Sequence, residues 1–488
     1  MRIANQKYFA LLCALGFASS AGAFTVWGPA EAWQTPTLDY VDRSFIYGES
    51  ENGATKILGQ GARLNVPVLT YGFDDTFTEY FGTQGVKAVD AAMAVLNALP
   101  RASAVNLSTY LTDGAQQVNY TAQALSLFDV KSETLALLLE HAGLLGETHV
   151  FDLRARTAQA GTQIPCQFYY FTVLRNYDPV TYNPTAYVNG VQYGYDIVEL
   201  CGAGQQVADA VEYPEDTARP PGSFTAVATK EGITVGGYYI GLTRDDVGGI
   251  RWLYRSSRLV NETLDPNSFI TSLGSSSFNP AGTTLFLTNA STRLGGVEKV
   301  TYVKVGYDSV SGTTPKPITY NYTMPITVNG RVSTIHVTRF INTPDIIFTA
   351  ADLVDTGFSP PRDFGTTRTT SFFTSPDLPI GGGVNGPGAE PAVIQPQTII
   401  TFNNVNPIYR NQQPAFLSDL NVAAYPLFQW GSFDGSGNAP IVYPNGSSLL
   451  QAEEQAVNGN PEQSTISTSF NPVGSIVTGG NVSFLGNF

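Results

Sequence analysis

Histidines are the first residues to examine for metal chemistry, and the chain has only three of them. His141 and His149 lie close together in the sequence, with Glu140 and Glu147 beside them. Imidazole and carboxylate groups are the usual protein ligands of zinc, together with thiolates. Two glycines separate these histidines, however, and glycine disfavours the continuous helix that would bring both rings to one face. We therefore interpret His141 and His149 as structural histidines.

Two pairs of adjacent aspartates are candidates for acid–base catalysis. Asp74 and Asp75 precede Glu79, and neighbouring side chains of an extended segment point in opposite directions. A turn or a helix cap is therefore favoured for this pair. Asp245 and Asp246 stand in the first turn of an expected helix, where carboxylates are favoured by the helix dipole. Capping is the preferred interpretation there too.

Oxygen-bearing side chains at alternate positions mark a glycine-rich segment near the end of the chain. Asp434, Ser436 and Asn438 have the spacing of calcium ligands in a loop. The segment lacks the further acidic residues and the terminal glutamate of an EF-hand, so a plain hairpin turn is favoured over a calcium site. Serine nucleophiles have no support, because no serine lies in a Gly-x-Ser-x-Gly segment. We expect no cofactor.

Three segments are predicted to form helices. Residues 84–99 have apolar side chains at spacings of three and four, which is typical of one helix face. Residues 131–142 are apolar nearly all round over their central part, which predicts a buried helix. Residues 243–254 begin with a threonine and two aspartates, which predicts an N-capped helix.

Strands are predicted for most of the remaining regular structure. Residues 67–71 are rich in β-branched and aromatic types, and residues 300–305, 318–322 and 333–340 alternate between apolar and polar types. Only 14% of residues are charged, a composition that favours strands and turns over exposed helices. We therefore predict an α+β fold, in which a mixed α/β N-terminal domain is followed by β-sandwich-like and β-rich C-terminal regions.

The first 23 residues have the features of a signal peptide. Arg2 and Lys7 precede a short apolar run, which ends in Ala21-Gly22-Ala23. No later stretch reaches the roughly 20 apolar residues of a membrane span, so we expect no transmembrane segment after signal cleavage. These features place the protein in the periplasm, at the cell surface or outside the cell. The formal charge of −14 argues against a nucleic-acid partner.

Cysteine and tyrosine give two further expectations. Cys166 and Cys201 remain after the signal peptide is removed, and an oxidising compartment favours a disulfide between them over two buried thiols. Tyrosines cluster at 169–170, at 193 and 195, and at 238–239. Packing between strands explains most of them, and a groove for a glycan or a protein is the alternative.

Changes of composition divide the chain into six segments. They are a signal peptide (1–23), an irregular lead-in laid over the surface (24–63), a mixed α/β domain (64–256), a β-sandwich-like domain (257–378), a Gly/Pro-rich linker (379–397) and a β-rich C-terminal segment (398–488).

Three parts of the 64–256 segment resemble the matrixin family of zinc metallopeptidases, which belongs to the metzincins. Leu69–Phe73 and the helix to Leu99 are similar to the family's opening strand and first helix, and Leu242–Tyr254 is similar to its closing helix. Asp129–Gly146 is similar to the helix that binds zinc. The resemblance implies a metzincin-like fold for this segment.

Residues that bind zinc in that family are replaced in this chain. The family's helix carries His-Glu-x-x-His, followed by a third histidine. The corresponding positions here are Leu137, Leu138, His141 and Glu147. Leucine offers no lone pair to a metal, so the resemblance implies a degenerate zinc helix with no catalytic residue.

The whole chain also resembles a group of uncharacterised secreted bacterial proteins, in which segments like 242–254, 343–353 and 430–446 occur in this order. We therefore expect a secreted, non-catalytic binding or structural protein of the bacterial envelope or exterior, whose ligand is an unknown protein or glycan. The alternatives are a divergent zinc metallopeptidase with residual proteolytic activity and an enzyme of another kind.

Overall fold

The computed structural model describes a large part of the chain as an α+β protein, with few helices and with strands in several sheets. The predicted α+β class is confirmed. No helix in the described part is long and apolar enough to cross a membrane. The described residues are 23–26, 58–112, 114–144, 151–155, 170–174, 176–202, 205–218, 226–228, 234–260, 262, 264–265, 267–273, 293–328, 330–354, 366–373, 393–402 and 429–443.

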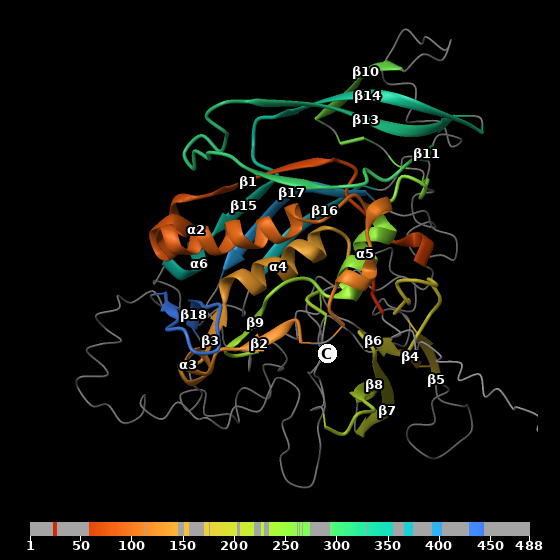
Figure 1. The fold of residues 1–488 in the computed structure, drawn as a ribbon, viewed down its shortest axis with the longest axis vertical. Coiled ribbons are helices and arrows are strands. Elements are labelled where there is room, and N and C mark those ends of the chain that lie inside the picture. Colours follow the sequence, from red (N-terminus) through yellow and green to blue (C-terminus); the bar gives the residue numbers. More distant parts are fainter. Residues whose placement is uncertain are drawn as a thin grey trace, which may run out of the picture.

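The largest sheet has five strands in the order β12-β1-β15-β17-β16 (Figure 1). Strands β12, β1, β15 and β17 run parallel, and β16 is antiparallel to β17. Strands β1 and β15 are almost entirely apolar and mostly buried, as expected for parallel strands covered on both faces. The strands are β1 (Val68–Phe73), β12 (Thr301–Lys304), β15 (Ile346–Thr349), β16 (Thr366–Phe373) and β17 (Val393–Phe402).

Helix α2 (Asp75–Asn97) lies against β1, β12 and β15, and α4 (Val130–His141) packs beside it (Figure 1). Asp74 caps α2, because its carboxylate accepts the N–H of Phe77 at 2.9 Å. The short helix α6 (Ala351–Val354) also contacts α2. Apolar side chains of α2, α4 and the five-stranded sheet form one buried core.

A second sheet is antiparallel, in the order β10-β14-β13-β11, and lies above β1 in Figure 1. Its strands are β10 (Ser268–Leu273), β11 (Arg293–Leu294), β13 (Ile318–Val328) and β14 (Arg331–Ile341). Alternate side chains of these strands form a separate apolar cluster, which includes Ile270, Met324, Ile326, Ile335 and Val337. The period of two in the sequence of this region thus places one face of the sheet inward.

A buried ion-pair network joins the two sheets. The guanidinium of Arg339 in β14 donates to Asp345 at 3.0 Å and lies 3.3 Å from Asp265. Asp345 in turn accepts the backbone N–H of Thr70 in β1 at 2.7 Å and its hydroxyl at 2.9 Å. Charge-assisted bonds of this kind offset the cost of burying the charges, and they connect β14 of one sheet to β1 of the other.

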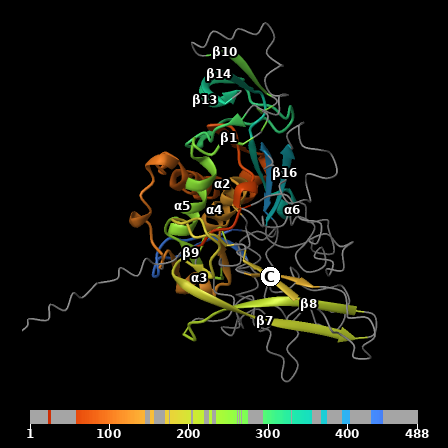
Figure 2. The same cartoon turned by 90° about the vertical axis from the view of Figure 1, so that its right-hand side faces the viewer.

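Smaller elements complete the described part of the fold. Figure 2 shows β7 and β8 as a long hairpin away from the main core. The small sheets contain β3 (Leu127–Asp129), β18 (Gln429–Ser432) and β19 (Ile441–Val442); β2 (Gln116–Val118) and β9 (Gly237–Tyr239); β4 (Phe151–Ala155) and β5 (Tyr170–Leu174); and β6 (Tyr187–Val188), β7 (Val191–Gly202) and β8 (Gln205–Pro214). The remaining helices are α3 (Tyr120–Ala124), α5 (Arg244–Tyr254), and the 3-10 turns η2 (Leu58–Gln60), η3 (Ala102–Ala104) and η4 (Leu107–Thr109).

Each of the three predicted helices is present. Helix α4 matches residues 131–142 within one residue, and α5 begins directly after its predicted cap, Thr243. Helix α2 begins at Asp75, before the predicted residue 84, and is kinked at Gly82, whose φ is +58°. The predicted helix corresponds to the part that follows the kink. Glycine adopts this left-handed conformation without steric cost, so one kinked helix replaces a shorter one.

The strand pairing cuts across the predicted segments. Strand β1 of the 64–256 segment pairs with β12 and β15 of the 257–378 segment. Strand β17 begins at Val393, inside the expected 379–397 linker, and continues into the 398–488 segment. Strand β18 of that last segment pairs with β3. The boundaries therefore divide shared sheets and do not separate independent domains.

The expected lead-in is also corrected where it is described. Phe24 and Val26 form bridges with Tyr177 and Leu144, and both side chains are buried. Arg63 is buried as well and donates to the carbonyls of Leu253 and Arg258 and to Glu262. These stretches fill the interior, whereas the sequence suggested that they lie over the surface.

Candidate functional site

The N-terminus of α4 is held by a buried polar chain. The carboxylate of Asp129 accepts the N–H and the hydroxyl of Ser132, at 2.9 and 2.6 Å. The hydroxyl of Ser132 accepts the N–H of Tyr239 in β9 at 2.8 Å. Burial raises the pKa of Asp129 to about 6, although the bonds from Ser132 oppose the shift. This carboxyl therefore caps the helix and fixes it against β9.

The positions of α4 that the sequence resemblance aligns with zinc ligands lie in the core. Leu137 is 1% exposed and Leu138 is 0% exposed, which confirms the prediction that this helix is buried. His141 is fully buried on the same helix. Glu147, the fourth position, lies outside the described residues, as does His149. The structure therefore places three of the four positions on one helix in apolar surroundings, where the two leucines serve as packing residues.

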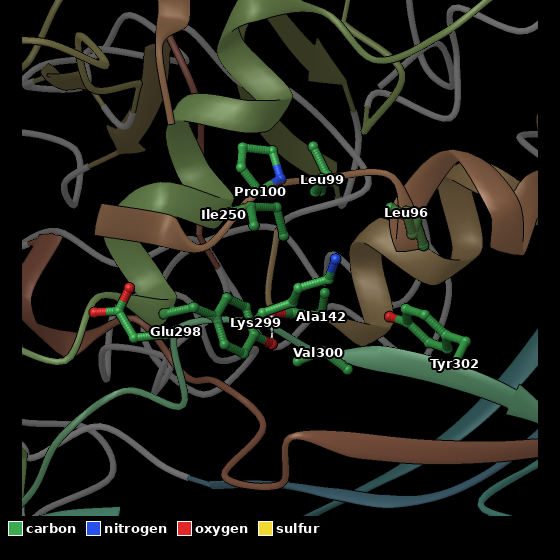
Figure 3. A pocket seen from close by; sticks show the side chains of 10 residues that line it. Leu96, Leu99, Pro100, Ala142, Ile250, Glu298, Lys299, Val300 and Tyr302 are labelled. Carbon is green, nitrogen blue, oxygen red and sulfur yellow. Dashed lines mark hydrogen bonds between the residues drawn. The ribbon is translucent and has the colours of Figure 1, made fainter. Parts of the chain in front are cut away.

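A small, mainly apolar pocket lies at the C-terminal ends of α2 and α4 (Figure 3). Its charged residues already have backbone partners: Glu298 accepts the N–H groups of Ser103 and Ser256 at 2.9 and 2.6 Å, and Lys299 donates to the carbonyl of Asn97 at 2.8 Å. These bonds give both charges a structural role. The pocket is lined by Leu96, Leu99, Pro100, Ala142, Ile250, Tyr254, Glu298, Lys299, Val300 and Tyr302.

Both aspartate pairs lie at helix N-termini, as predicted. Asp74 is the cap of α2 and Asp75 lies in its first turn, whereas Glu79 is exposed further along the helix. Asp246 forms a capping box with Thr243: its carboxylate accepts the backbone N–H of Thr243 at 2.9 Å, and Thr243 Oγ1 accepts the N–H of Asp246 at 3.3 Å. Capping explains Asp246.

Asp245 has a second role that the sequence did not reveal. Its carboxylate is fully buried and accepts the backbone N–H groups of Ala23 and Asn189, both of which lie far from it in the sequence. The adjacent aspartates therefore have different roles. Asp246 caps α5, and Asp245 accepts hydrogen bonds from the backbone of Ala23 and Asn189. Pattern and spacing alone assign both to the helix terminus.

The calcium-loop candidate lies in the connection between the antiparallel strands β18 and β19. Asn438 donates its side-chain amide to the carboxylate of Asp434 at 2.8 Å, and its carbonyl accepts the amide of Asn119 at 2.8 Å. Ser436 is exposed in the same connection. The segment therefore forms the turn of the β18–β19 hairpin, held by a hydrogen bond within it and by Asn119.

Three tyrosines of these clusters are buried, and Tyr195 is partly buried. Tyr193, Tyr238 and Tyr239 have almost no exposed surface, which supports packing over a groove at these positions. The disulfide expectation lies outside the described residues, since Cys166 is not described and only the backbone of Cys201, in β7, is.

An exposed aromatic pair is the feature that the sequence analysis missed. Phe269 in β10 and Phe340 in β14 are 42% and 46% exposed, and their rings are stacked with centroids 5.4 Å apart. The alternating pattern of β14 marks Phe340 as outward-facing, but only the pairing with β10 brings Phe269 to it.

Within the described residues, no group of three or more His, Cys, Asp and Glu side chains is arranged to hold a metal ion. Comparisons of the chain with models of known protein families, with curated proteins and with solved structures found no match.

Proposed function

We propose that this chain is an exported, non-catalytic protein that binds a glycan through the outer face of its antiparallel sheet. The observation that carries the proposal is the exposed pair Phe269 and Phe340 on a sheet whose inner face is packed against an apolar cluster. Export is inferred from the signal-like sequence of residues 1–23.

The absence of catalysis is proposed from the zinc-like helix. In a matrixin-like site, a metal lowers the pKa of a bound water and a glutamate accepts its proton. Leu137 and Leu138 occupy the places of a ligand and of that glutamate, and both are buried apolar side chains. The order of β1, α2, α4 and α5 is compatible with a metzincin-like arrangement, and the stacked antiparallel sheet is compatible with a sandwich-like one.

Strand register defines the outer face. Thr338 pairs with Phe269 on one side and with Asn321 on the other, and Phe340 pairs with Thr319. Directly paired residues of antiparallel strands lie on the same face, as do residues two apart. Phe269, Thr319, Asn321, Thr338 and Phe340 therefore share one face. Ile270 and Val337, which adjoin two of them in the sequence, belong to the apolar cluster on the other face.

The chemistry of this face fits a carbohydrate. Aromatic rings offer apolar faces on which the C–H surface of a sugar ring stacks, and the exposed Thr319 and Asn321 offer a hydroxyl and an amide group beside them. Thr338 donates to the side-chain oxygen of Asn321 at 2.6 Å, which orients the amide group next to the rings. None of these five residues is charged, although the exposed His336, which pairs with Thr323, lies on the same face. Arg293 shares this face only at the far end of β13, where it pairs with Thr327. A neutral glycan is therefore favoured over a polyanion at the rings.

The test is binding of the purified protein to neutral bacterial and plant polysaccharides, measured by affinity electrophoresis and by pull-down on insoluble fibres. Replacing Phe269 and Phe340 together by Ala is expected to weaken retention at least tenfold, since hot-spot aromatics contribute about 2 kcal/mol or more. Val310→Ala is the control, because Val310 is an apolar residue that is 96% exposed and lies outside this sheet. Equal retention of both variants would refute the proposed face.

Catalysis is tested separately. The same preparation is expected to cleave neither casein nor gelatin. Stoichiometric zinc that survives dialysis, together with cleavage that a chelator abolishes, would instead support the divergent-peptidase alternative.

A further inference from the structure

Ala23 is built into the fold as an interior residue. Its side chain is 0% exposed and belongs to an apolar cluster with Val188, Val191, Tyr193 and Ala226. Its backbone N–H is donated to Asp245 Oδ2. The next residue, Phe24, exchanges two backbone hydrogen bonds with Tyr177, at 3.0 and 2.9 Å. Removing Ala23 would therefore leave a hole in the cluster and take a donor from a buried carboxylate.

Only one of the two carboxylate oxygens of Asp245 accepts hydrogen bonds from the described residues. Oδ2 accepts the N–H of Ala23 and, at 2.6 Å, the N–H of Asn189. Oδ1 is buried and has no hydrogen-bond partner among the described residues. Burial raises the pKa of Asp245 well above its ordinary value, and neighbouring Asp246 adds to the shift, while the two N–H bonds and Arg244 oppose it. A buried carboxylate whose second oxygen lacks a donor in the described part of the chain is a costly arrangement.

An ammonium group at the position of the Ala23 nitrogen would complete this site. An amide nitrogen offers one proton, whereas an ammonium offers three protons and a full positive charge. One proton would remain on Oδ2, a second is available to Oδ1, and the charge would offset that of the carboxylate. Asp245 also lies in the first turn of α5, where the helix dipole already favours an anion.

The sequence offers several places at which a leader peptidase finds small residues at the required positions, including cleavage after Ala21, with Ser19 and Ala21 at those positions. Two of these places put the new N-terminus on a described residue. Ala21 and Ala23 permit cleavage after Ala23, as the sequence analysis expected, and Ser20 and Gly22 permit cleavage after Gly22. The first cleavage would put the new ammonium on Phe24, whose nitrogen donates to a neutral carbonyl, that of Tyr177. The second would put it on Ala23, at a buried carboxylate.

We propose that the mature chain begins at Ala23 and that its α-ammonium forms a buried ion pair with Asp245. Hydrolysis of the Gly22–Ala23 peptide bond consumes one water: the hydroxyl goes to the Gly22 carbonyl carbon, and a proton goes to the Ala23 nitrogen. The amine then takes up a further proton from solvent at neutral pH. The processing step rests on the proposed export, but the pairing itself does not.

The pairing is tested with two full-length mature chains made without export. One is translated as Met-Ala23 and the other as Met-Ser20, so that removal of the initiator Met leaves Ala23 or a three-residue extension at the N-terminus. The Ala23 α-amine is expected to react with an acylating reagent at least tenfold more slowly than the Ser20 α-amine. The Ala23 chain is also expected to melt about 2 °C or more above the extended chain.

Asp245→Asn in both chains supplies the control, since it removes the charge and keeps the shape. Both differences are expected to disappear in this pair of variants. A difference in melting temperature that persists between the two Asp245→Asn chains overturns the proposal. Equal amine reactivity in the two unsubstituted chains also overturns it. That second measurement tests the proposal even if the Asp245→Asn variants do not fold.

N-terminal sequencing of the exported protein tests the processing step. A first residue of Ala23 supports it. Any other first residue, such as Phe24 or Gly22, overturns it while leaving the proposed export intact, and an unprocessed chain overturns both.

Discussion

At the scale of single residues, the buried leucines of α4 are expected to contribute to the stability of the fold. Leu138 is 0% exposed and lies in the main apolar core. Leu138→Ala is expected to lower the free energy of unfolding by about 2 to 5 kcal/mol, because it removes buried methyl groups and leaves a cavity. Leu125→Ala, at a position 40% exposed just after α3, is the control and is expected to cost less than about 1 kcal/mol. Urea unfolding followed by circular dichroism measures both, and similar losses would contradict the packing role of Leu138.

Asp129 gives the fold a pH dependence with a definite sign. Burial raises its pKa from 3.8 to about 6, so between these values the folded chain holds a proton that the unfolded chain has lost. Protonation therefore stabilises the fold at low pH, and this contribution is lost as the pH rises through 6, with a total of about 3 kcal/mol. Lower pH favours the folded state through this group.

Asp129→Asn isolates that contribution, because asparagine is also a good helix cap but does not titrate. Unfolding free energies of both proteins at pH 4, 5, 6 and 7 are expected to diverge, with the unsubstituted protein losing about 3 kcal/mol relative to the variant. Parallel pH curves would show that Asp129 keeps its ordinary pKa.

At the scale of elements, the helix termini are where sequence and structure agree best. The Thr243 hydroxyl and the Asp246 carboxylate cap α5 reciprocally. Thr243→Ala is expected to destabilise the protein by about 1 to 2 kcal/mol, whereas Thr243→Ser keeps the hydroxyl and is expected to cost much less. Thermal melts of the two variants compare them directly, and equal melting temperatures would show that the hydroxyl does not stabilise the helix.

The capped helices could be predicted because their signals are local. Thr243 and the two aspartates lie within four residues and predict the start of α5. The apolar run of α4 can be recognised without knowing which elements pack against it. Asp245 shows the limit of this reasoning. Its sequence position assigns it to the helix terminus, but its actual donors, Ala23 and Asn189, are brought to it by the tertiary fold.

The same limit applies to the exposed aromatic pair. Alternation in residues 333–340 predicts which side chains of β14 point outward. It does not predict which strand lies beside β14, so the stacking of Phe269 on Phe340 has no local signal. The candidate binding face therefore depends on strand register, whereas Leu137, Leu138 and His141 were singled out from the sequence alone, by a resemblance.

At the scale of the whole molecule, long-range pairing makes the predicted domains interdependent. Strand β1 has β12 on one side and β15 on the other, and both come from beyond residue 256. Residues from these later strands, including Tyr302, Ile346 and Phe348, share the core with α2 and α4. Turn and linker composition in the sequence suggested boundaries, but composition carries no information on which strands pair.

A chain cut after residue 256 is therefore expected not to fold alone. Such a fragment would leave both edges of β1 without hydrogen-bond partners and expose the apolar side of α2, which favours aggregation. Fragment 257–488 would lose β1, the strand between β12 and β15, as well as Thr70, a partner of the buried Asp345. Expressed together, the two fragments are expected to co-purify as a soluble complex with the circular dichroism spectrum of the intact chain. Expressed separately, neither is expected to show a cooperative urea transition. Cooperative unfolding of fragment 23–256 by itself would establish an autonomous N-terminal domain and contradict the shared-sheet architecture as the source of stability.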